Sequence, residues 1–147
     1  MKSARHRSRE FALQGLYQAQ LSGNGPEAIA AHLADVSGFD KCDADYFREL
    51  LYGVIGDRDA LDALLAPLVD RKVSALSPIE HAILWIGVFE LRDRLEIPYK
   101  VVINEAIELA KSYGGTDGHK YVNGVLDRLA PRLRPETEAS VRRAPPA

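Results

Sequence analysis

The sequence of 147 residues has a single cysteine, Cys42, and no apolar run long enough to cross a membrane. One cysteine excludes a disulfide framework within the chain and is typical of proteins in a reducing cytoplasm. The longest apolar run, Ala82 to Phe89, is far shorter than the roughly 20 residues that a spanning helix needs. The charged N-terminus also lacks the apolar core of a secretory signal. We therefore expect a cytoplasmic protein without a membrane segment.

The residue patterns that carry catalysis or metal binding are also missing. The histidines are His6, His32, His81 and His119, and no two of them stand at metal-ligand spacing. There is no G-x-S-x-G motif, and Cys42 lies among acids that would raise its pKa and weaken it as a nucleophile. We expect no catalytic residue, no metal site and no cofactor, and hence no enzyme.

The net charge of −2 is small, but it is unevenly distributed. Residues 1–10 carry a balance of +3, with Lys2, Arg5, Arg7 and Arg9 against one acid, Glu10. Residues 35–70 contain nine acids and three bases, a balance of −6. A basic arm on an acidic body suits local contact with phosphates. The alternative, which composition alone favours, is a solvated terminus without a ligand.

Apolar residues recur at helical spacing along most of the chain, which predicts an all-α fold of about seven helices. The apolar stripes lie in residues 13–21, 29–33, 47–54, 61–68, 82–91, 103–110 and 122–129. The stretch Ser77-Pro78-Ile79-Glu80 is the clearest helix start, since it combines a capping serine, a proline and a glutamate at capping-box spacing. We expect one domain over residues 1–131, divided near residues 71–77 into two helical halves, and a disordered tail over residues 132–147.

The stretch GGTDGHKYVNG, residues 114–124, joins the last two predicted helices. It is not a phosphate-binding P-loop, because no strand precedes it and Tyr121 stands where that motif needs a hydroxyl residue. Gly114 and Gly115 predict the end of one helix, and Thr116 or Asp117 the start of the next, which we expect Pro131 to end.

Lys120 and Tyr121 fall in the first turn of this last helix. A cation and an aromatic plane beside free backbone amides could hold a phosphate and stack an unpaired base. Equally, Tyr121 could pack in the core and Lys120 could be merely solvated. At the other end of the chain, Arg5 and Arg9 share a face if the first helix extends back to them, whereas Arg7 points about 160° away. The arginines therefore suit a flexible or fraying arm better than a flat patch.

Three segments together resemble the NusB family of bacterial transcription antitermination factors. They are RHRSREFALQGLYQ, LSPIEHAILWIGVFEL and IPYKVVINEAIELAKSYGGTDGHKYVNGVLDRLA, and the resemblance runs from about Arg5 to Pro131. It implies two packed helical bundles that bind boxA, a short single-stranded RNA element of ribosomal operon leaders. It also implies pairing with the small-subunit ribosomal protein NusE and assembly of the antitermination complex on RNA polymerase. Some family members self-associate, so the choice between monomer and homodimer stays open.

The resemblance also implies particular residue roles. The RNA-binding residues expected from it are Lys2, Arg5, Arg7, Arg9, Tyr17, Lys120 and Tyr121. Glu80 and Asp117 are expected at the partner-binding face. Glu80 is also expected to act in the capping box of its helix, and Asp117 to cap the last helix. His6 stands where an arginine is common in relatives, which makes RNA affinity slightly weaker and more pH-sensitive.

We expect the RNA to run from the basic arm across Tyr17 towards Lys120 and Tyr121. A helical scaffold that binds proteins through its acidic middle helices, without RNA contact, is the alternative. An enzyme with a pocket between the two halves is less favoured, because the sequence shows no convergent polar groups for it.

Overall fold

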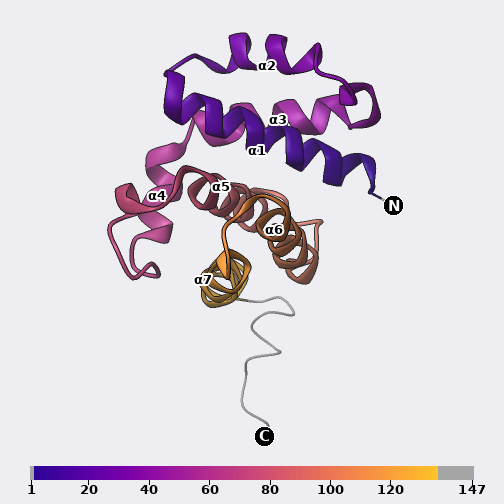
Figure 1. Cartoon of the computed structure of the whole chain (residues 1–147). Coiled ribbons are helices and arrows are strands. Elements are labelled where there is room, and N and C mark those ends of the chain that lie inside the picture. Colours follow the sequence, from indigo (N-terminus) through magenta and orange to yellow (C-terminus); the bar gives the residue numbers. More distant parts are fainter. Residues whose placement is uncertain (1, 136–147) are drawn as a thin grey trace, which may run out of the picture. The chain divides into compact units, whose positions relative to one another are not determined.

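The computed structural model describes residues 2–135, and this part of the chain folds into α-helices and two short 3₁₀-helices (Figure 1). The α-helices are α1 (Ala4–Ser22), α2 (Pro26–Ala34), α3 (Ala44–Ile55), α4 (Arg58–Leu65), α5 (Pro78–Asp93), α6 (Tyr99–Tyr113) and α7 (Gly118–Leu133). The 3₁₀-helices are η1 (Phe39–Lys41) and η2 (Val73–Ala75). Residues 2–135 contain no strand, so the predicted all-α fold is confirmed. The tail expected beyond residue 135 lies outside the described residues.

The helices form two compact units, the first ending at Arg58 and the second beginning at Asp59. This division falls earlier than the expected one near residues 71–77. The reason is that α4 is bound to α5: Asp62 Oδ1 is hydrogen-bonded to His81 Nε2 at 2.6 Å and to Trp85 Nε1 at 2.8 Å. Two bonds to side chains of α5 place α4 in the second unit.

In the first unit, α1 packs against both α2 and α3 (Figure 1). Gly15 permits this close approach, because a Cβ there would lie 2.9 Å from Leu51 Cδ1 and 3.1 Å from Ile29 Cγ2. Helix α3 begins at a side-chain cap, with Asp43 accepting a hydrogen bond from the amide of Tyr46 at 3.1 Å. Its predicted apolar stripe is buried.

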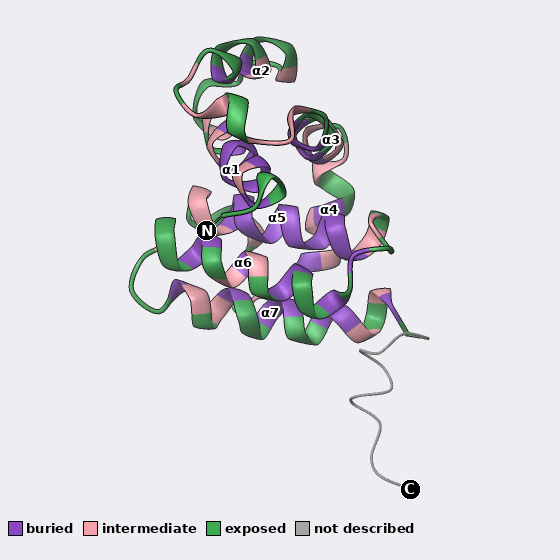
Figure 2. Ribbon diagram, turned by 90° about the vertical axis from the view of Figure 1, so that its right-hand side faces the viewer, coloured by how far each residue is buried: buried purple, intermediate pink, exposed green. Residues whose placement is uncertain are grey.

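In the second unit, α5, α6 and α7 pack against one another, and α5 is buried along most of its length (Figure 2). Its predicted start is confirmed, since Ser77 Oγ accepts from the amide of Glu80 at 3.2 Å. Gly87 lets α7 approach, because a Cβ there would lie 2.7 Å from Leu126 Cδ1. None of the helices in the described part of the chain is both long and apolar enough to span a bilayer.

Helix α7 does not end at Pro131, as expected, but continues to Leu133. A proline this close to the end of a helix removes one backbone hydrogen bond without breaking the turns before it. The last turn is then closed by Arg134, whose amide donates to the Ala130 carbonyl at 2.9 Å. The first residues assigned to the disordered tail therefore belong to the fold.

The side chain of Arg134 explains why the fold extends so far. It is only 4% exposed, and its guanidinium donates to four backbone carbonyls at the end of α5 and in the loop that follows. These are the carbonyls of Glu90, Leu91, Arg94 and Ile97, at 2.5–3.0 Å. The last carbonyls of a helix lack full pairing within the helix, and Arg134 supplies donors to them, although the carbonyls of Glu90 and Arg94 also accept from the amides of Arg94 and Ile97.

Replacing Arg134 with methionine should destabilise the protein by about 3 kcal/mol, because each buried carbonyl left without a donor costs about 1–3 kcal/mol. Urea denaturation followed by circular dichroism measures this change. The matched control is Arg132→Met in the same turn, where the side chain is exposed and the cost should stay within about 0.5 kcal/mol. Equal costs for the two variants would contradict the anchoring role of Arg134.

Candidate nucleic-acid interface

The basic residues near the N-terminus lie on a helix and not on an arm, which corrects the expectation of a flexible segment. Helix α1 begins at Ala4, and Ser3 caps it by accepting from the amide of His6 at 3.0 Å. Ser8 Oγ donates to the Asp43 carbonyl at 2.6 Å, and the Asp43 amide donates to the Ala4 carbonyl at 3.3 Å. These bonds to the start of α3 hold the first turns of α1 in place.

Because α1 extends this far, Arg5 and Arg9 share a face, as the conditional prediction stated. Both guanidinium groups lie over the ring of Tyr46, with Cζ at 4.5 Å from the centroid for Arg5 and 5.5 Å for Arg9. Arg5 is exposed, whereas Arg9 is only 3% exposed. Arg5 can therefore reach a ligand, and Arg9 supports the ring on which Arg5 lies. Arg7 is half-buried.

Lys2 and His6 both lie beside the carboxylate of Glu10. Lys2 Nζ is 2.8 Å and His6 Nε2 is 3.8 Å from Glu10 Oε2. The Lys2 side chain is half exposed, so its charge reaches solvent, but His6 is buried. Its burial against Glu10 indicates a packing role for His6 and not a direct contact with RNA. Further along α1, Tyr17 keeps 37% of its surface exposed.

In the described residues, no three His, Cys, Asp or Glu side chains gather at metal-binding distance. Burial raises the pKa of the Cys42 thiol, and the charge of Asp43 adds to the effect. The predicted direction of this pKa shift is correct, but its main cause is burial and not the neighbouring acids.

In the second unit, Asp117 occupies the N-cap position of α7, but its side chain makes no capping hydrogen bond. Its backbone is left-handed, with φ of 63°, a conformation that aspartate tolerates better than most residues. A capping side chain normally extends from a β-region backbone, so the predicted cap is wrong. The carboxylate instead lies beside Lys120, with Oδ1 at 3.3 Å from Nζ.

Three of the backbone amides at the start of α7, those of Gly118, Lys120 and Tyr121, are not free to hold a phosphate, contrary to our expectation. The amide of Gly118 donates to the Gly115 carbonyl at 3.0 Å. Those of Lys120 and Tyr121 both donate to the Asp117 carbonyl, at 3.1 and 3.3 Å. Moreover, the Glu80 carboxylate lies at this helix start, with Oε2 at 3.2 Å from the position of a Cβ on Gly118. A negative charge already faces the positive end of the helix dipole, so only side chains can bind a phosphate here.

Tyr121 is half-buried and contacts two residues that lie between α4 and η2. Its hydroxyl donates to Asp70 Oδ1 at 3.1 Å, and the Cζ of Arg71 lies 5.1 Å from its ring centroid. The phenol is thus neither a core residue nor an open stacking surface. The sequence gives little sign of this contact, because Asp70 and Arg71 belong to no apolar stripe and lie about 50 residues before Tyr121.

The three groups hold one another in defined charge states. Hydrogen bonds from Arg71 and then Tyr121 lower the pKa of Asp70, and the bond to Asp70 raises the pKa of Arg71, with a further contribution from Glu80. Burial, followed by the bond to Asp70, raises the pKa of Tyr121. At neutral pH, Asp70 and Arg71 are therefore charged and Tyr121 keeps its proton as a donor.

The predicted site residues are divided between the two units. Lys2, Arg5, Arg7, Arg9 and Tyr17 belong to the first unit, and Glu80, Asp117, Lys120 and Tyr121 belong to the second. Within the second unit, the start of α7 brings Glu80 close to Gly118, and Lys120 close to Asp117. The RNA path from one group to the other stays a prediction.

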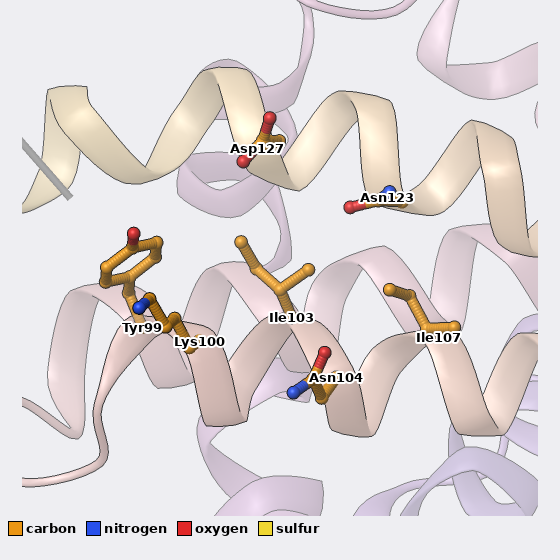
Figure 3. A pocket seen from close by; sticks show the side chains of 7 residues that line it. All are labelled: Tyr99, Lys100, Ile103, Asn104, Ile107, Asn123 and Asp127. Carbon is orange, nitrogen blue, oxygen red and sulfur yellow. The ribbon is translucent and has the colours of Figure 1, made fainter. Parts of the chain in front are cut away.

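A groove of about 440 Å³ lies between α6 and α7 (Figure 3). Its lining residues are Tyr99, Lys100, Ile103, Asn104, Ile107, Asn123 and Asp127. A second hollow, of about 420 Å³, lies at the turn before α7 and includes Lys111, Asp117 and His119. The second hollow borders the predicted interface, whereas none of the predicted site residues lines the groove.

Comparison with known proteins gives one consistent result. The family model described as "NusB family" matches residues 6–131. The transcription antitermination protein NusB of Paraburkholderia xenovorans (strain LB400) is 56% identical over 144 residues, which are 97% of this chain and 100% of the relative. That of Acidovorax sp. (strain JS42) is 57% identical over 133 residues, covering 90% of this chain and 75% of the relative.

Solved structures show the same fold. The structure of T. maritima NusB superposes with a TM-score of 0.83 at 29% identity, covering 96% of this chain and 99% of that one. A crystal structure of the antitermination factors NusB and NusE in complex with dsRNA gives a TM-score of 0.75 at 22% identity, with coverage of 86% and 96%. Because the family model, the relatives and the fold agree over nearly all of the described helices, this chain belongs to the NusB family.

Proposed function

We propose that the chain is a non-enzymatic transcription antitermination factor that acts in the cytoplasm. It binds boxA-type single-stranded RNA of ribosomal operon leaders together with the ribosomal protein NusE. The complex then helps to assemble the antitermination machinery on RNA polymerase. Relatives that match nearly the whole chain are named as transcription antitermination proteins, and a protein of the same fold has been solved with NusE and RNA.

The observation that carries this proposal is the surface around Tyr121. One cationic side chain, Arg71, lies over an aromatic ring that is only half-buried, and a second cation, Lys120, precedes that residue on α7. Lys120 is 72% exposed, so its charge is available to a phosphate. A cation next to an aromatic plane is the combination that binds single strands, because the ring stacks an unpaired base while the cation pairs with the backbone.

In the first unit, Arg5 and Lys2 contribute exposed cations, and Tyr17 contributes a second exposed ring. Arg7 lies on another part of the α1 surface and makes a weaker contact. Arg9 acts through its packing on Tyr46, since burial keeps it from the ligand. The first unit thus offers exposed cations and an exposed ring at separate places along α1, since Arg5 and Tyr17 lie twelve residues apart.

Glu80 and Asp117 form part of the surface that binds NusE. Asp117 is exposed, and Glu80 is half-buried at the start of both α5 and α7. The position of Glu80 supports two roles, because its carboxylate stabilises the positive end of α7 and remains accessible to a partner. Removal of its charge should therefore affect NusE binding more than stability.

Binding to a boxA-type RNA should be specific, should tighten when NusE is added and should weaken as salt rises. Each phosphate contact releases counterions, so the log–log slope should be about −0.7 per contact for a single strand. Fluorescence anisotropy over a salt series, with a scrambled RNA as control, measures both quantities. Equal, feeble binding to the two RNAs even with NusE present would favour the protein-binding scaffold instead.

Tyr121→Ala should weaken binding of boxA-type RNA by about 1–3 kcal/mol, the usual loss when a stacked base loses its aromatic partner. Tyr121→Phe keeps the ring and removes only the hydroxyl that donates to Asp70, so it should bind RNA nearly as tightly as wild type. Tyr52→Ala, at a comparably exposed tyrosine of α3, is the control and should have no effect. If Tyr121→Ala behaved like Tyr52→Ala, stacking on Tyr121 would be wrong.

Glu80→Gln should weaken NusE binding several-fold while leaving the helix content intact, because glutamine preserves the shape of the side chain and removes its charge. Isothermal titration calorimetry with NusE and far-UV circular dichroism measure the two effects separately. Glu108→Gln, on the exposed side of α6, serves as the charge-matched control. A loss of helix in Glu80→Gln without a loss of affinity per folded molecule would leave Glu80 with a structural role alone.

A further inference from the structure

We propose that Arg71 binds an RNA phosphate and that the carboxylate of Asp70 occupies the phosphate position in the free protein. This inference rests on the proposed RNA-binding function and extends it to two residues that neither the family resemblance nor the spacing of the sequence selects. Asp70 would act as an internal competitor, which RNA must displace before it can use the surface around Tyr121.

The contact between the two residues has the geometry of a guanidinium with an oxyanion. Arg71 Nε donates to Asp70 Oδ1 at 2.8 Å, and Arg71 Nη2 donates to Asp70 Oδ2 at 3.2 Å. Two parallel hydrogen bonds of this kind are also how arginine binds phosphate. A phosphate that arrives at Arg71 would therefore meet the same pair of donors, now taken by Asp70.

The pair is weak enough to be exchanged. The Arg71 side chain is 46% exposed and that of Asp70 is 65% exposed, so solvent reaches both charges. Exposed ion pairs contribute little to stability, because water and salt screen them. No buried contact has to break for Asp70 to release Arg71.

Release of this pair would also change the surface of Tyr121. Asp70 Oδ1 accepts the hydroxyl of Tyr121 as well as Arg71 Nε, and the guanidinium lies over the ring. As long as Asp70 holds Arg71, the cation occupies a place on the ring where a base could stack. Once a phosphate draws Arg71 away, the ring is open to that base, so the two contacts form together.

A second cation of this surface, Lys120, is also paired with an exposed acid. Lys120 Nζ lies 3.3 Å from Asp117 Oδ1, and both side chains are well exposed. Glu80 adds another negative charge close to Arg71. The acids weaken the attraction of this surface for any phosphate. Only a strand that also stacks a base on the Tyr121 ring regains the lost binding free energy. We infer that the acids suppress binding of RNA that lacks such a base.

Asp70→Asn is the direct test, since asparagine keeps the shape and removes the competing charge. Affinity for a boxA-type RNA should rise about threefold to fivefold, the range that an exposed ion pair supports. The matched control is Asp93→Asn, because Asp93 forms an equivalent pair with its neighbour Arg92 at 3.0 and 2.6 Å. Both variants change the net charge equally, so a general charge effect would appear in both.

Arg71→Gln completes the test. It should weaken RNA binding and make the salt slope shallower by about 0.7, the value for one lost phosphate contact. Asp70→Asn should then have no effect in the Arg71→Gln background, because the competitor acts only through Arg71. Thermal unfolding of each variant confirms that these exposed substitutions leave the fold intact.

The outcomes separate this inference from the proposed function. The wild-type protein could prefer boxA-type RNA while Asp70→Asn binds it no more tightly than Asp93→Asn does. This result would overturn the role of Asp70 as a competitor and leave the proposed function standing. Weaker binding by Asp70→Asn would also overturn it, since Asp70 would then position Tyr121 for RNA. Wild-type protein that fails to distinguish the two RNAs, with or without NusE, would overturn both.

Discussion

The second unit depends on the burial of α5, because the helices around it are positioned by contacts with its two ends and its middle. At the start of α5, the Glu80 carboxylate lies beside Gly118, and in its middle Gly87 contacts Leu126. At its end, the carbonyls of α5 accept hydrogen bonds from Arg134. These contacts follow the same order along α5 and α7, so the two helices run parallel. The first turn of α7, which carries Tyr121, is thereby fixed relative to the start of α5. The position of Tyr121 is thus a consequence of core packing, whereas Asp70 and Arg71 reach it from the loop between α4 and η2.

Three cations at the candidate interface, Lys2, Arg71 and Lys120, have an acid as neighbour, and the burial of the acid distinguishes two kinds of pair. Glu10 is buried beside Lys2 and His6, so its loss would leave the packing of α1 incomplete. Asp70 and Asp117 are exposed beside their cations and can be replaced by another anion at little cost. This difference explains how a chain with a negative net charge presents cations to RNA at a few places only.

The elements that could be predicted from the sequence are those specified by neighbouring residues. The Ser77 cap and the apolar α5 are of this kind, since each depends on residues within a few turns. The predicted Asp117 cap failed locally, because its backbone is left-handed. Two other errors concern contacts between distant segments. Arg134 binds carbonyls about 40 residues earlier, and Tyr121 binds Asp70 51 residues earlier. Neither contact leaves a periodic pattern, so α7 was expected to end too soon and half of the Tyr121 surface was overlooked.

The closed start of α7 has a consequence for the kind of RNA that the second unit can bind. Free backbone amides would bind any phosphate, but here they donate to the carbonyls of Asp117 and Gly115, with Glu80 alongside. Binding must then use the ring of Tyr121 together with the side chains of Arg71 and Lys120. Bases in an A-form duplex are already paired and stacked, so they cannot reach a ring on a protein surface, whereas unpaired bases can. A preference for single strands therefore follows from the ring of Tyr121, which rewards an unpaired base, whereas Arg71 and Lys120 can bind the phosphates of any strand.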